Sequence, residues 1–393
     1  MITYDVAIIG AGAAGMMCAI EAGKRGRTVM LIEHSDKPGE KIRISGGGRC
    51  NFTNLHCGPN NFISANPHFA KSALKRYSQR DFIAWIDRHR IAWHEKTLGQ
   101  LFCDGPATQI IDALRGEMRE AGVGVRLGVS VISHKREGEG FELRLSDGTV
   151  FRCRSLVIAT GGKSIPKMGA TGFAYDVAKA YGLEVTETRP ALVPLTFGPD
   201  ILERFKPISG IAVDAIVRAG KTSFEEALLF THRGLSGPAI LQISSYWREG
   251  EEISINFQPG FGIFEELKSQ RAENGRQAIG TAMSVFLPKR LAQLLAADCG
   301  LAGNLADQSD KKLKALEAWL RDWRIKPTGS EGYRTAEVTL GGIETAGLDS
   351  RSMEARQAPG LYFIGEAVDV TGWLGGFNFQ WAWSSGWSAG QHV

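Results

Sequence analysis

The chain begins with the alternation of apolar strand and small-residue helix that is typical of a βαβ unit. Residues 4–9 are almost wholly apolar, an Ala-rich stretch runs to Gly23, and residues 28–32 are apolar again. Short continuous apolar runs are typical of strands buried on both faces of a parallel sheet. A similar run at 361–364 and a helix of small residues over 382–390 end the chain. The two ends therefore predict one shared α/β domain.

Helices and short strands alternate between these ends. Apolar residues at helical spacing predict three helices between residues 66 and 122, the first opened by Asn66-Pro67, and another helix over 171–181. Short apolar segments predict strands at 123–132, 141–145, 150–153 and 156–159. We interpret the last three as a meander that ends at Ala159.

A change of pattern near residue 190 indicates an insertion. Prolines punctuate short alternating runs, as in a small antiparallel sheet or barrel, and helical spacing returns between 261 and 323. We therefore predict an α/β protein with a Rossmann-like nucleotide-binding domain. Its predicted parts are a split domain of residues 1–189 and 331–393, an inserted β-barrel-like subdomain at 190–258, and a helical cap at 259–330.

A glycine-rich turn, Gly10-Ala11-Gly12-Ala13-Ala14-Gly15, follows the first strand directly, and the second strand ends at Glu33. Gly10 permits a tight turn, Gly12 lets the backbone approach a pyrophosphate, and Gly15 lets the helix touch the strand. The helix N-terminus offers N–H groups and a positive dipole end to phosphates. Glu33 is placed to accept ribose hydroxyls and disfavours the 2′-phosphate of NADP. The alternative is a turn in a domain that binds no nucleotide.

Two further glycine-rich segments lie where the same ligand would pass. Residues 41–51 contain Lys41, Arg49 and three consecutive glycines, so we expect the backbone there to approach a flat or anionic group. A flexible basic loop is the alternative. The strand that ends at Ala159 is followed by Thr160-Gly161-Gly162, which is typical of the strand that passes the adenosine and pyrophosphate of FAD.

The C-terminal segment favours FAD over NAD alone. Gly365-Glu366 ends a buried strand, a glycine-rich turn follows at 372–376, and the last helix begins after it. The dipole of that helix would stabilise negative charge on a reduced flavin. The alternative is that this glycine-rich segment only docks the C-terminus onto the domain and binds no cofactor. No second GxGxxG motif is found, so either NAD(P)H docks transiently on the flavin or the substrate supplies the electrons.

Composition bears on the cofactor, the cellular compartment and the partners of the protein. The 393 residues include 48 glycines, against a usual share of ~7%, as a large buried cofactor would demand. Six scattered cysteines without a CxxC pair exclude a disulfide framework and a zinc site, and they fit a reducing cytoplasm. We find no signal peptide and no apolar stretch of about 18 residues that would span a membrane. The net charge of +4 does not demand nucleic acid.

These motifs resemble those of the YhiN/BaiN-type bacterial flavoproteins. The resemblance rests on Gly10–Gly15, Ser45–Asn51, Phe230–Pro238 and Gly365–Gln380, and extends over essentially the whole chain. It implies FAD, a split FAD domain, an inserted β-barrel and a helical cap. Members reduce an enone in bile-acid metabolism, oxidise a small amine, or reduce a uridine of ribosomal RNA to dihydrouridine. The residues expected to contact FAD are Gly10, Gly12, Ala13, Ala14, Gly15, Glu33, His34, Lys41, Ser45, Gly46, Gly47, Gly48, Arg49, Cys50, Asn51, Val131, Ala159, Thr160, Gly161, Gly162, Gly365, Glu366, Asp369, Gly372, Gly375, Gly376, Phe377, Asn378 and Gln380.

Together these features predict an FAD-dependent oxidoreductase that transfers a hydride through flavin N5. We expect it to reduce a conjugated C=C bond of a small molecule or of a uracil base, with NAD(P)H as donor. A small-amine oxidase that uses O2 and a non-catalytic FAD-binding or RNA-associated protein are the alternatives. His232 and Cys50 are the catalytic candidates, against a structural turn histidine and a buried packing cysteine. Basic helices at 71–90 and basic residues at 311–326 form solvated faces or, alternatively, an RNA-binding patch.

Overall fold

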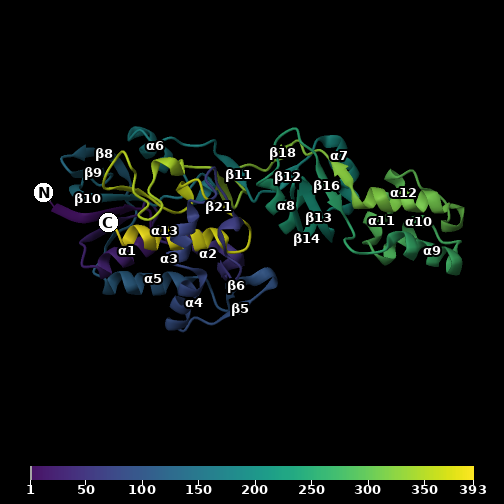
Figure 1. Cartoon of the computed structure of the whole chain (residues 1–393), viewed down its shortest axis with the longest axis horizontal. Coiled ribbons are helices and arrows are strands. Elements are labelled where there is room, and N and C mark those ends of the chain that lie inside the picture. Colours follow the sequence, from purple (N-terminus) through teal and green to yellow (C-terminus); the bar gives the residue numbers. More distant parts are fainter. Residues whose placement is uncertain (1) are drawn as a thin grey trace. The chain divides into compact units, whose positions relative to one another are not determined.

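The computed structural model describes residues 2–393, which form two compact units (Figure 1). Unit 1 contains the chain up to Pro190 and again Glu337–Val393, and unit 2 contains Ala191–Ala336. Unit 2 is therefore an insertion between two parts of one domain. Close to the two crossing points, β11 (Arg189–Ala191) and β19 (Val338–Leu340) pair with each other.

A parallel sheet is the centre of unit 1. Its strand order is β7-β2-β1-β10-β20, and every neighbouring pair is parallel. The strands are β1 (Ile2–Ile9), β2 (Val29–Ile32), β7 (Gly124–Arg126), β10 (Val150–Ile158) and β20 (Leu361–Phe363). Val6, Ala7 and Ile8 are fully buried, as expected for a parallel sheet covered on both faces. The carboxyl ends of the strands meet at one edge, which is where open α/β sheets bind their ligands.

An antiparallel meander extends from β10. β8 (Val131–Glu137) pairs with β9 (Gly140–Leu145), which pairs with the first half of β10. The prediction of one strand over 123–132 is wrong, because this stretch divides between β7 and β8. The chain turns between them, where the N–H groups of Gly128 and Val129 donate to Ser35 O at 3.0 Å and Glu33 O at 3.1 Å. The predicted strands at 150–153 and 156–159 are one continuous strand, β10.

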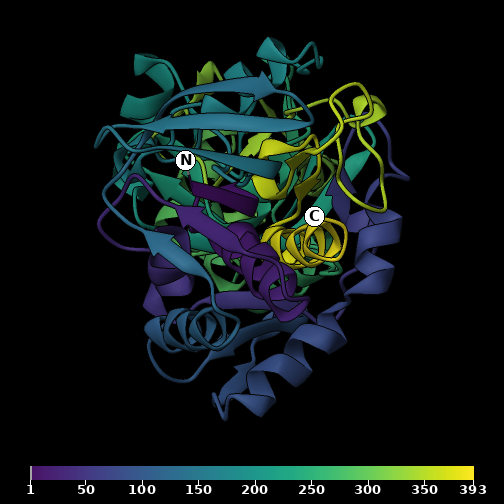
Figure 2. The ribbon, with the colours of Figure 1, turned by 90° about the vertical axis from the view of Figure 1, so that its left-hand side faces the viewer.

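The first and last helices of the chain pack against each other through small residues. In Figure 2, α13 (Phe377–Gly390) is the yellow helix seen end-on, beside the purple α1 (Ala13–Lys24). A Cβ atom added to Gly386 would lie 2.4 Å from Ala14 O, and one on Gly390 would lie 2.6 Å from Glu21 Cβ. Only glycine allows the two helices to approach this closely.

Further short elements surround this core. The helices are α2 (Glu40–Gly48), α3 (Ala70–Arg76), α4 (Gln79–Arg88), α5 (Thr108–Glu120) and α6 (Phe173–Ala180). Two small antiparallel sheets consist of β3 (Asn51–Asn54), β6 (Gln100–Cys103) and β5 (Trp93–Glu95), and of β4 (Phe62–Ile63) and β21 (Thr371–Gly372). The predicted helix start at Asn66-Pro67 is too early. The Asn66 side chain accepts a hydrogen bond from His68 N at 3.0 Å in a turn, and α3 begins only at Ala70.

A nearly buried carboxylate joins α5 to two neighbouring helices. Glu117 accepts a hydrogen bond from Lys24 Nζ and contacts His89 Nε2, each at 2.7 Å. Burial by itself would raise the pKa of Glu117. The hydrogen bonds from Lys24 and His89 outweigh burial and leave that pKa below its ordinary value of 4.5.

We expect Glu117 to stabilise the fold at neutral pH and to lose this effect in acid. Because the folded-state pKa is the lower one, the contribution is complete above the ordinary value of 4.5 and disappears as pH falls through the lowered pKa. Urea unfolding of the wild type and Glu117→Gln tests this. The difference in unfolding free energy should be about 1 kcal/mol at neutral pH and shrink in acid. A difference that does not vary with pH would contradict the assignment.

Unit 2 contains a curled antiparallel sheet with the strand order β17-β16-β13-β14-β15-β12-β18. The strands are β12 (Leu195–Thr196), β13 (Ala212–Ala219), β14 (Thr222–Thr231), β15 (Gly234–Ser236), β16 (Ile253–Asn256), β17 (Trp323–Ile325) and β18 (Gly329–Ser330). The edge strands β17 and β18 are separated by only three residues of chain. The sheet must therefore curl until its two edges approach each other, which makes it barrel-like.

The helices of unit 2 occupy less of the chain than the sequence pattern predicts. They are α7 (Pro199–Phe205), α8 (Pro238–Ser244), α9 (Ile263–Asn274), α10 (Ile279–Ala282), α11 (Lys289–Asp298) and α12 (Asp310–Arg321). The predicted helical cap at 259–330 therefore includes two strands of the sheet. Trp323, at the end of the predicted helical stripe, packs instead against Phe205 and Phe257, with ring centroids 6.1 and 5.3 Å apart.

Candidate functional site

The glycine-rich turn at the carboxyl end of β1 has the geometry of a dinucleotide fingerprint. Gly10 has a φ of 107°, and a Cβ atom on it would lie 2.5 Å from Ala159 O. A Cβ atom on Gly15 would lie 1.9 Å from Gly10 O, whereas one on Gly12 would meet no atom within 4 Å. Gly10 and Gly15 are thus required by close backbone contacts within the protein. Gly12 borders open space, where a pyrophosphate has room to approach.

Glu33 ties the end of β2 to this turn. Its carboxylate accepts hydrogen bonds from Ala11 N at 2.8 Å and Ser35 N at 2.9 Å, and its side chain is 11% exposed. His34 Nδ1 lies 2.9 Å from Glu33 Oε1. Val131 starts the next strand after the turn that binds Glu33 and Ser35. The structure therefore holds the predicted ribose-binding carboxylate rigidly beside the phosphate-binding turn.

The end of α2 is an ordered left-handed turn, which argues against a flexible basic loop. Gly46, Gly47 and Gly48 have φ values of 57°, 67° and 87°. A Cβ atom on Gly46 would lie 2.7 Å from Phe102 Cε1, and one on Gly47 would meet nothing within 4 Å. The glycines are needed because a left-handed backbone disfavours other residues. Arg49 follows this turn with an exposed side chain.

Thr160 has a buried hydroxyl that forms no hydrogen bond with any described residue. Its Oγ1 atom has no hydrogen-bond partner, although buried polar groups are almost always paired. A Cβ atom on the neighbouring Gly161 would meet nothing within 4 Å, and Thr160 Cα lies 3.1 Å from the Cβ position of Gly10. An unpaired hydroxyl beside open backbone at the strand ends fits a bound dinucleotide, which would supply the missing partner.

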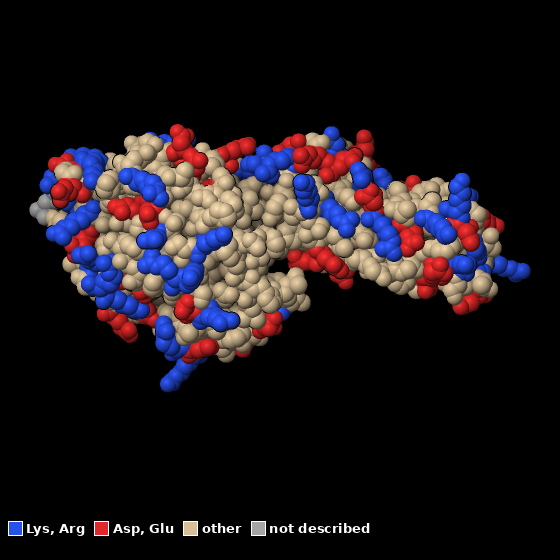
Figure 3. Space-filling view, in the orientation of Figure 1, with Lys and Arg blue, Asp and Glu red and all other residues tan. Residues whose placement is uncertain are grey.

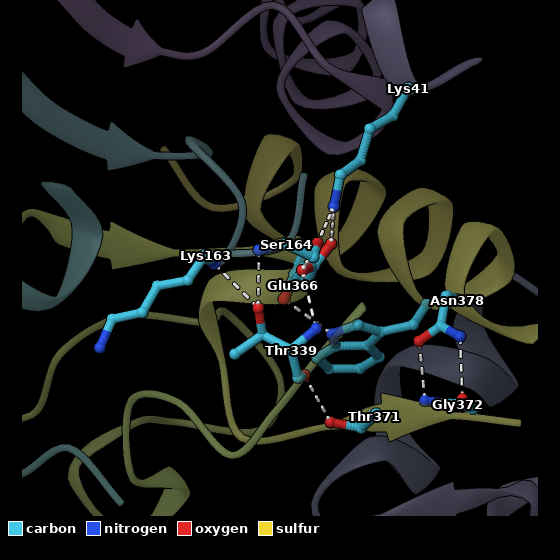
Figure 4. Close-up of polar contacts among 10 residues, drawn as sticks. Lys41, Lys163, Ser164, Thr339, Glu366, Thr371, Gly372 and Asn378 are labelled. Carbon is cyan, nitrogen blue, oxygen red and sulfur yellow. Dashed lines mark hydrogen bonds and ion pairs between the residues drawn. The ribbon is translucent and has the colours of Figure 1, made fainter. Parts of the chain in front are cut away.

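A compact polar cluster joins α2 to the C-terminal strand end (Figure 4). Glu366 accepts hydrogen bonds from Lys41 Nζ at 2.5 Å, Ser164 Oγ at 2.8 Å and Thr339 N at 3.0 Å. Lys41 also donates to Ser164 Oγ at 2.6 Å, and Thr339 Oγ1 accepts from Lys163 N at 2.8 Å. Glu366 is 17% exposed and Lys41 is 35% exposed. The cluster holds the Lys41 ammonium in one place at the sheet edge.

The turn before α13 is built from glycines and closed by Asn378. Gly375 and Gly376 have φ values of 113° and 96°, and a Cβ atom on Gly376 would lie 2.4 Å from Thr53 O. The Asn378 amide accepts from Gly372 N and donates to Gly372 O, both at 2.8 Å (Figure 4). Phe377 then begins α13, and no side chain caps its first turn. Its free N–H groups suit an anionic or electron-rich partner.

Asp369 and Gln380 form buried hydrogen bonds within unit 1, and their role as cofactor contacts stays a prediction. Asp369 is 4% exposed and accepts a hydrogen bond from Ala65 N at 2.9 Å; burial raises its pKa. Gln380 is fully buried, accepts from Thr53 Oγ1 at 2.6 Å and donates to Tyr77 O at 3.1 Å. Both side chains brace the C-terminal segment against the rest of unit 1.

The two catalytic candidates have very different surroundings. Cys50 is fully buried, and burial raises the pKa of its thiol well above the ordinary value. Burial of a neutral thiol favours the packing alternative for Cys50, and its catalytic role stays a prediction. His232 is exposed on the turn between β14 and β15 in unit 2. Its role as a proton donor stays a prediction.

Ser164 and Thr339 belong to the Glu366 cluster, although the sequence pattern did not predict them there. Ser164 follows the predicted Thr160–Gly162 segment by two residues, so its position after a strand end was an available signal. Thr339 lies on β19, far from the fingerprint along the chain. Only tertiary structure brings it beside Lys163 and Glu366.

Comparison with known proteins identifies the family. The family profile described as "HI0933-like protein Rossmann domain" matches residues 4–392. This chain belongs to the HI0933-like family. The match confirms the resemblance seen in the motifs and makes the protein an FAD-dependent oxidoreductase with a Rossmann-like fold.

Several curated relatives match this HI0933-like protein over most of their length. It is 53% identical to the "Ribosomal RNA dihydrouridine synthase" of Escherichia coli (strain K12), and the match covers 99% of this chain and 98% of the relative. It is 44% identical to the protein of the same name from Haemophilus influenzae, over 97% and 96% of the two chains. Identity to the "3-dehydro-bile acid delta(4,6)-reductase" of Clostridium scindens is 28%, with 98% of both chains covered.

Solved structures support the fold of the HI0933-like chain. A 3-ketosteroid delta1-dehydrogenase from Sterolibacterium denitrificans matches with a TM-score of 0.54 and 15% identity, covering 100% of this chain and 99% of that one. A 3-ketosteroid-delta4-(5alpha)-dehydrogenase from Rhodococcus jostii RHA1 matches with a TM-score of 0.51 and 14% identity, covering 99% and 96%. Within residues 2–393, none of the helices has the length and apolar character needed to cross a membrane.

Proposed function

We propose that this protein reduces the C5=C6 bond of a uridine in ribosomal RNA, with FAD as cofactor and NAD(P)H as electron donor. The observation that supports this most strongly is the 53% identity, over nearly the whole chain, to a protein named for making dihydrouridine in ribosomal RNA. The FAD-fitting geometry of unit 1 agrees with it. Dihydrouridine differs from uridine by two hydrogens, so the reaction requires a hydride and a proton.

The residues of unit 1 fit FAD in distinct roles. The turn at Gly10–Gly15 and the N-terminus of α1 would bind the pyrophosphate, and Glu33 would accept ribose hydroxyls. Thr160 would gain a partner for its orphaned hydroxyl. Bound FAD, once reduced by NAD(P)H, would supply the hydride that the double bond accepts. Lys41, held by Glu366 and Ser164, places a fixed positive charge at the same sheet edge.

The second hydrogen added to the uracil ring is a proton, and we propose that His232 supplies it. A histidine suits this role because its ordinary pKa lies near neutrality. His232 is exposed on a short turn whose Thr231 Oγ1 accepts hydrogen bonds from Arg233 N at 3.2 Å and Gly234 N at 3.1 Å. These bonds order the backbone of the turn and leave the imidazole open to solvent.

Ribosomal RNA transcribed in vitro, which contains only unmodified uridine, tests the proposal. The holoenzyme with NADH or NADPH should form dihydrouridine, detected by mass spectrometry of the digested RNA. His232→Ala should retain FAD and lower the yield about 100-fold or more, whereas the matched variant His94→Ala, at an exposed histidine of unit 1, should not. A flavin that NAD(P)H reduces without any dihydrouridine would exclude this RNA as substrate. An unchanged yield would exclude His232 as proton donor.

A further inference from the structure

A long stretch of unit 1 carries no negative side chain. Residues 41–80 contain no Asp or Glu, although the chain as a whole has 42 in 393 residues. Over the same stretch there are seven basic residues, Lys41, Arg43, Arg49, Lys71, Lys75, Arg76 and Arg80. The stretch extends from the start of α2, through the glycine turn at its end, to the start of α4. A solvated surface that served only solubility would intersperse both signs.

The last part of this stretch forms an exposed basic surface, which we define as Lys71, Lys75, Arg76 and Arg80. All four side chains are exposed. Among the described residues, Lys71, Lys75 and Arg80 form no ion pair. The first acid beyond the stretch, Asp81, accepts from Ser78 N at 2.7 Å and Ser78 Oγ at 2.6 Å as a helix cap. Asp81 thus caps α4, and no ion pair between it and Lys71, Lys75 or Arg80 is found among the described residues.

Packing holds the basic surface in a fixed orientation. Ala70, Ala73 and Leu74 are buried on the inner side of α3, which leaves Lys71 and Lys75, one helical turn apart, on the outer side. Arg76 lies over the Trp387 ring of α13 at 5.3 Å and donates to Arg351 O at 2.9 Å. The surface is thus part of the domain that carries the FAD-fitting geometry, and it is rigid rather than a mobile tail.

Unit 2 carries both signs of charge along its helices. Several of its arginines pair with carboxylates, as in Arg204–Asp298, Arg271–Asp310, Arg321–Glu317 and Arg324–Asp322. In Figure 3, blue and red side chains alternate over the helices of unit 2, whereas blue side chains gather where Figure 1 shows α3. A local excess of positive charge of this kind attracts an anionic partner.

We propose that the basic surface of α3 and the start of α4 binds the sugar–phosphate backbone of the RNA substrate. This inference rests on the proposed function and adds the place where the RNA is held. Unpaired lysines and arginines on a rigid helix can displace the counterions of successive phosphates, and this release drives backbone binding. Backbone contacts position a nucleic acid without reading its sequence. The surface therefore supplies affinity for the RNA, and the choice of uridine is made elsewhere.

The test compares two triple variants of equal charge change. Lys71→Gln, Lys75→Gln and Arg80→Gln remove the basic surface but keep Arg76, which packs on Trp387. Lys221→Gln, Lys268→Gln and Lys289→Gln remove three exposed lysines of unit 2, all outside residues 311–326, as a control. Binding of the holoenzyme to ribosomal RNA transcribed in vitro is measured over a range of salt concentrations. FAD content and thermal unfolding of both variants confirm that each is folded.

We expect the α3 triple variant to reduce the slope of log K against log salt by about 2 to 3, because each lost phosphate contact removes about 0.7 to 0.9. At low salt its affinity for RNA should fall at least about tenfold, while the control keeps the wild-type slope. Equal losses in the two variants, or an unchanged slope in the α3 variant, would overturn the proposal. So would an α3-dependent affinity for anionic lipid vesicles that RNA binding does not share.

The outcome is separable from that of the proposed function. If the wild type forms dihydrouridine and the α3 variant binds RNA normally, the surface is wrong and the function stands. If the wild type forms no dihydrouridine but binds RNA through α3, the function is wrong and the surface stands.

Discussion

We expect Gly12→Ala to give a folded protein that does not retain FAD, and Gly15→Ala to give a protein whose nucleotide-binding domain does not fold. A Cβ atom at Gly12 meets nothing within 4 Å, and the φ of −82° there suits any residue. The stability of the protein without FAD should therefore change by less than about 1 kcal/mol. The added methyl group occupies the space through which the pyrophosphate approaches, so FAD affinity should fall at least about 100-fold, or about 2.7 kcal/mol.

Gly15→Ala is the matched substitution for which we expect loss of stability rather than loss of FAD alone. Its Cβ atom would lie 1.9 Å from Gly10 O, a backbone atom that cannot move without separating α1 from β1. We expect a loss of about 3 kcal/mol or more in unfolding free energy, at the upper end for overpacked sites. Flavin absorbance of the purified proteins, FAD titration after its removal, and urea unfolding measure both effects. A Gly12→Ala protein that keeps its flavin would contradict the assigned phosphate site.

Removal of the Glu366 carboxylate is the second large effect that we expect. Glu366→Ala leaves Lys41 Nζ, Ser164 Oγ and Thr339 N without their shared acceptor. Loss of one partner from a fully buried ion pair costs about 3–5 kcal/mol of unfolding free energy. We expect a loss of about 2 kcal/mol for Glu366→Ala, because Lys41 is 35% exposed and solvent weakens the pair. Urea unfolding of the FAD-free protein measures this loss.

A double-mutant cycle isolates the Lys41–Glu366 pair. Glu366→Gln keeps acceptors for Ser164 and Thr339 but removes the charge opposite Lys41. Lys41→Met should then cost less in the Glu366→Gln background than in the wild type, because the positive charge has already lost its partner. Strictly additive losses would show that the two side chains do not stabilise each other. Arg43→Met, at the neighbouring cation of α2 that pairs with Glu40, is the control.

Local patterns were sufficient to predict the fingerprint. The roles of Gly10, Gly12 and Gly15 depend on a strand, a turn and a helix that follow each other directly, so spacing alone specifies them. The pairing of Glu33 with Ala11 follows from the same unit, since β2 lies beside β1. The α/β class followed from the apolar runs at both ends of the chain.

Long-range contacts decided features that the sequence pattern does not encode. Asp369 and Gln380 lie in a glycine-rich segment of the right composition, but their partners Ala65, Thr53 and Tyr77 come from the opposite end of unit 1. Trp323 was predicted to continue the apolar stripe of a helix. It is instead the first residue of β17, which begins two residues after α12 ends, and apolar spacing alone does not distinguish the two.

By itself, the sequence determined the cofactor class, the family and the order of the elements, because these depend on backbone turns and apolar runs that are local in the chain. Tertiary structure alone decided which polar side chains remain available to a ligand. Lys41, Ser164, Thr339 and Glu366 come from four separate segments and satisfy one another, while the Thr160 hydroxyl is left unpaired. A hydrogen bond depends on distance in space, and spacing along the chain does not encode that distance between remote segments.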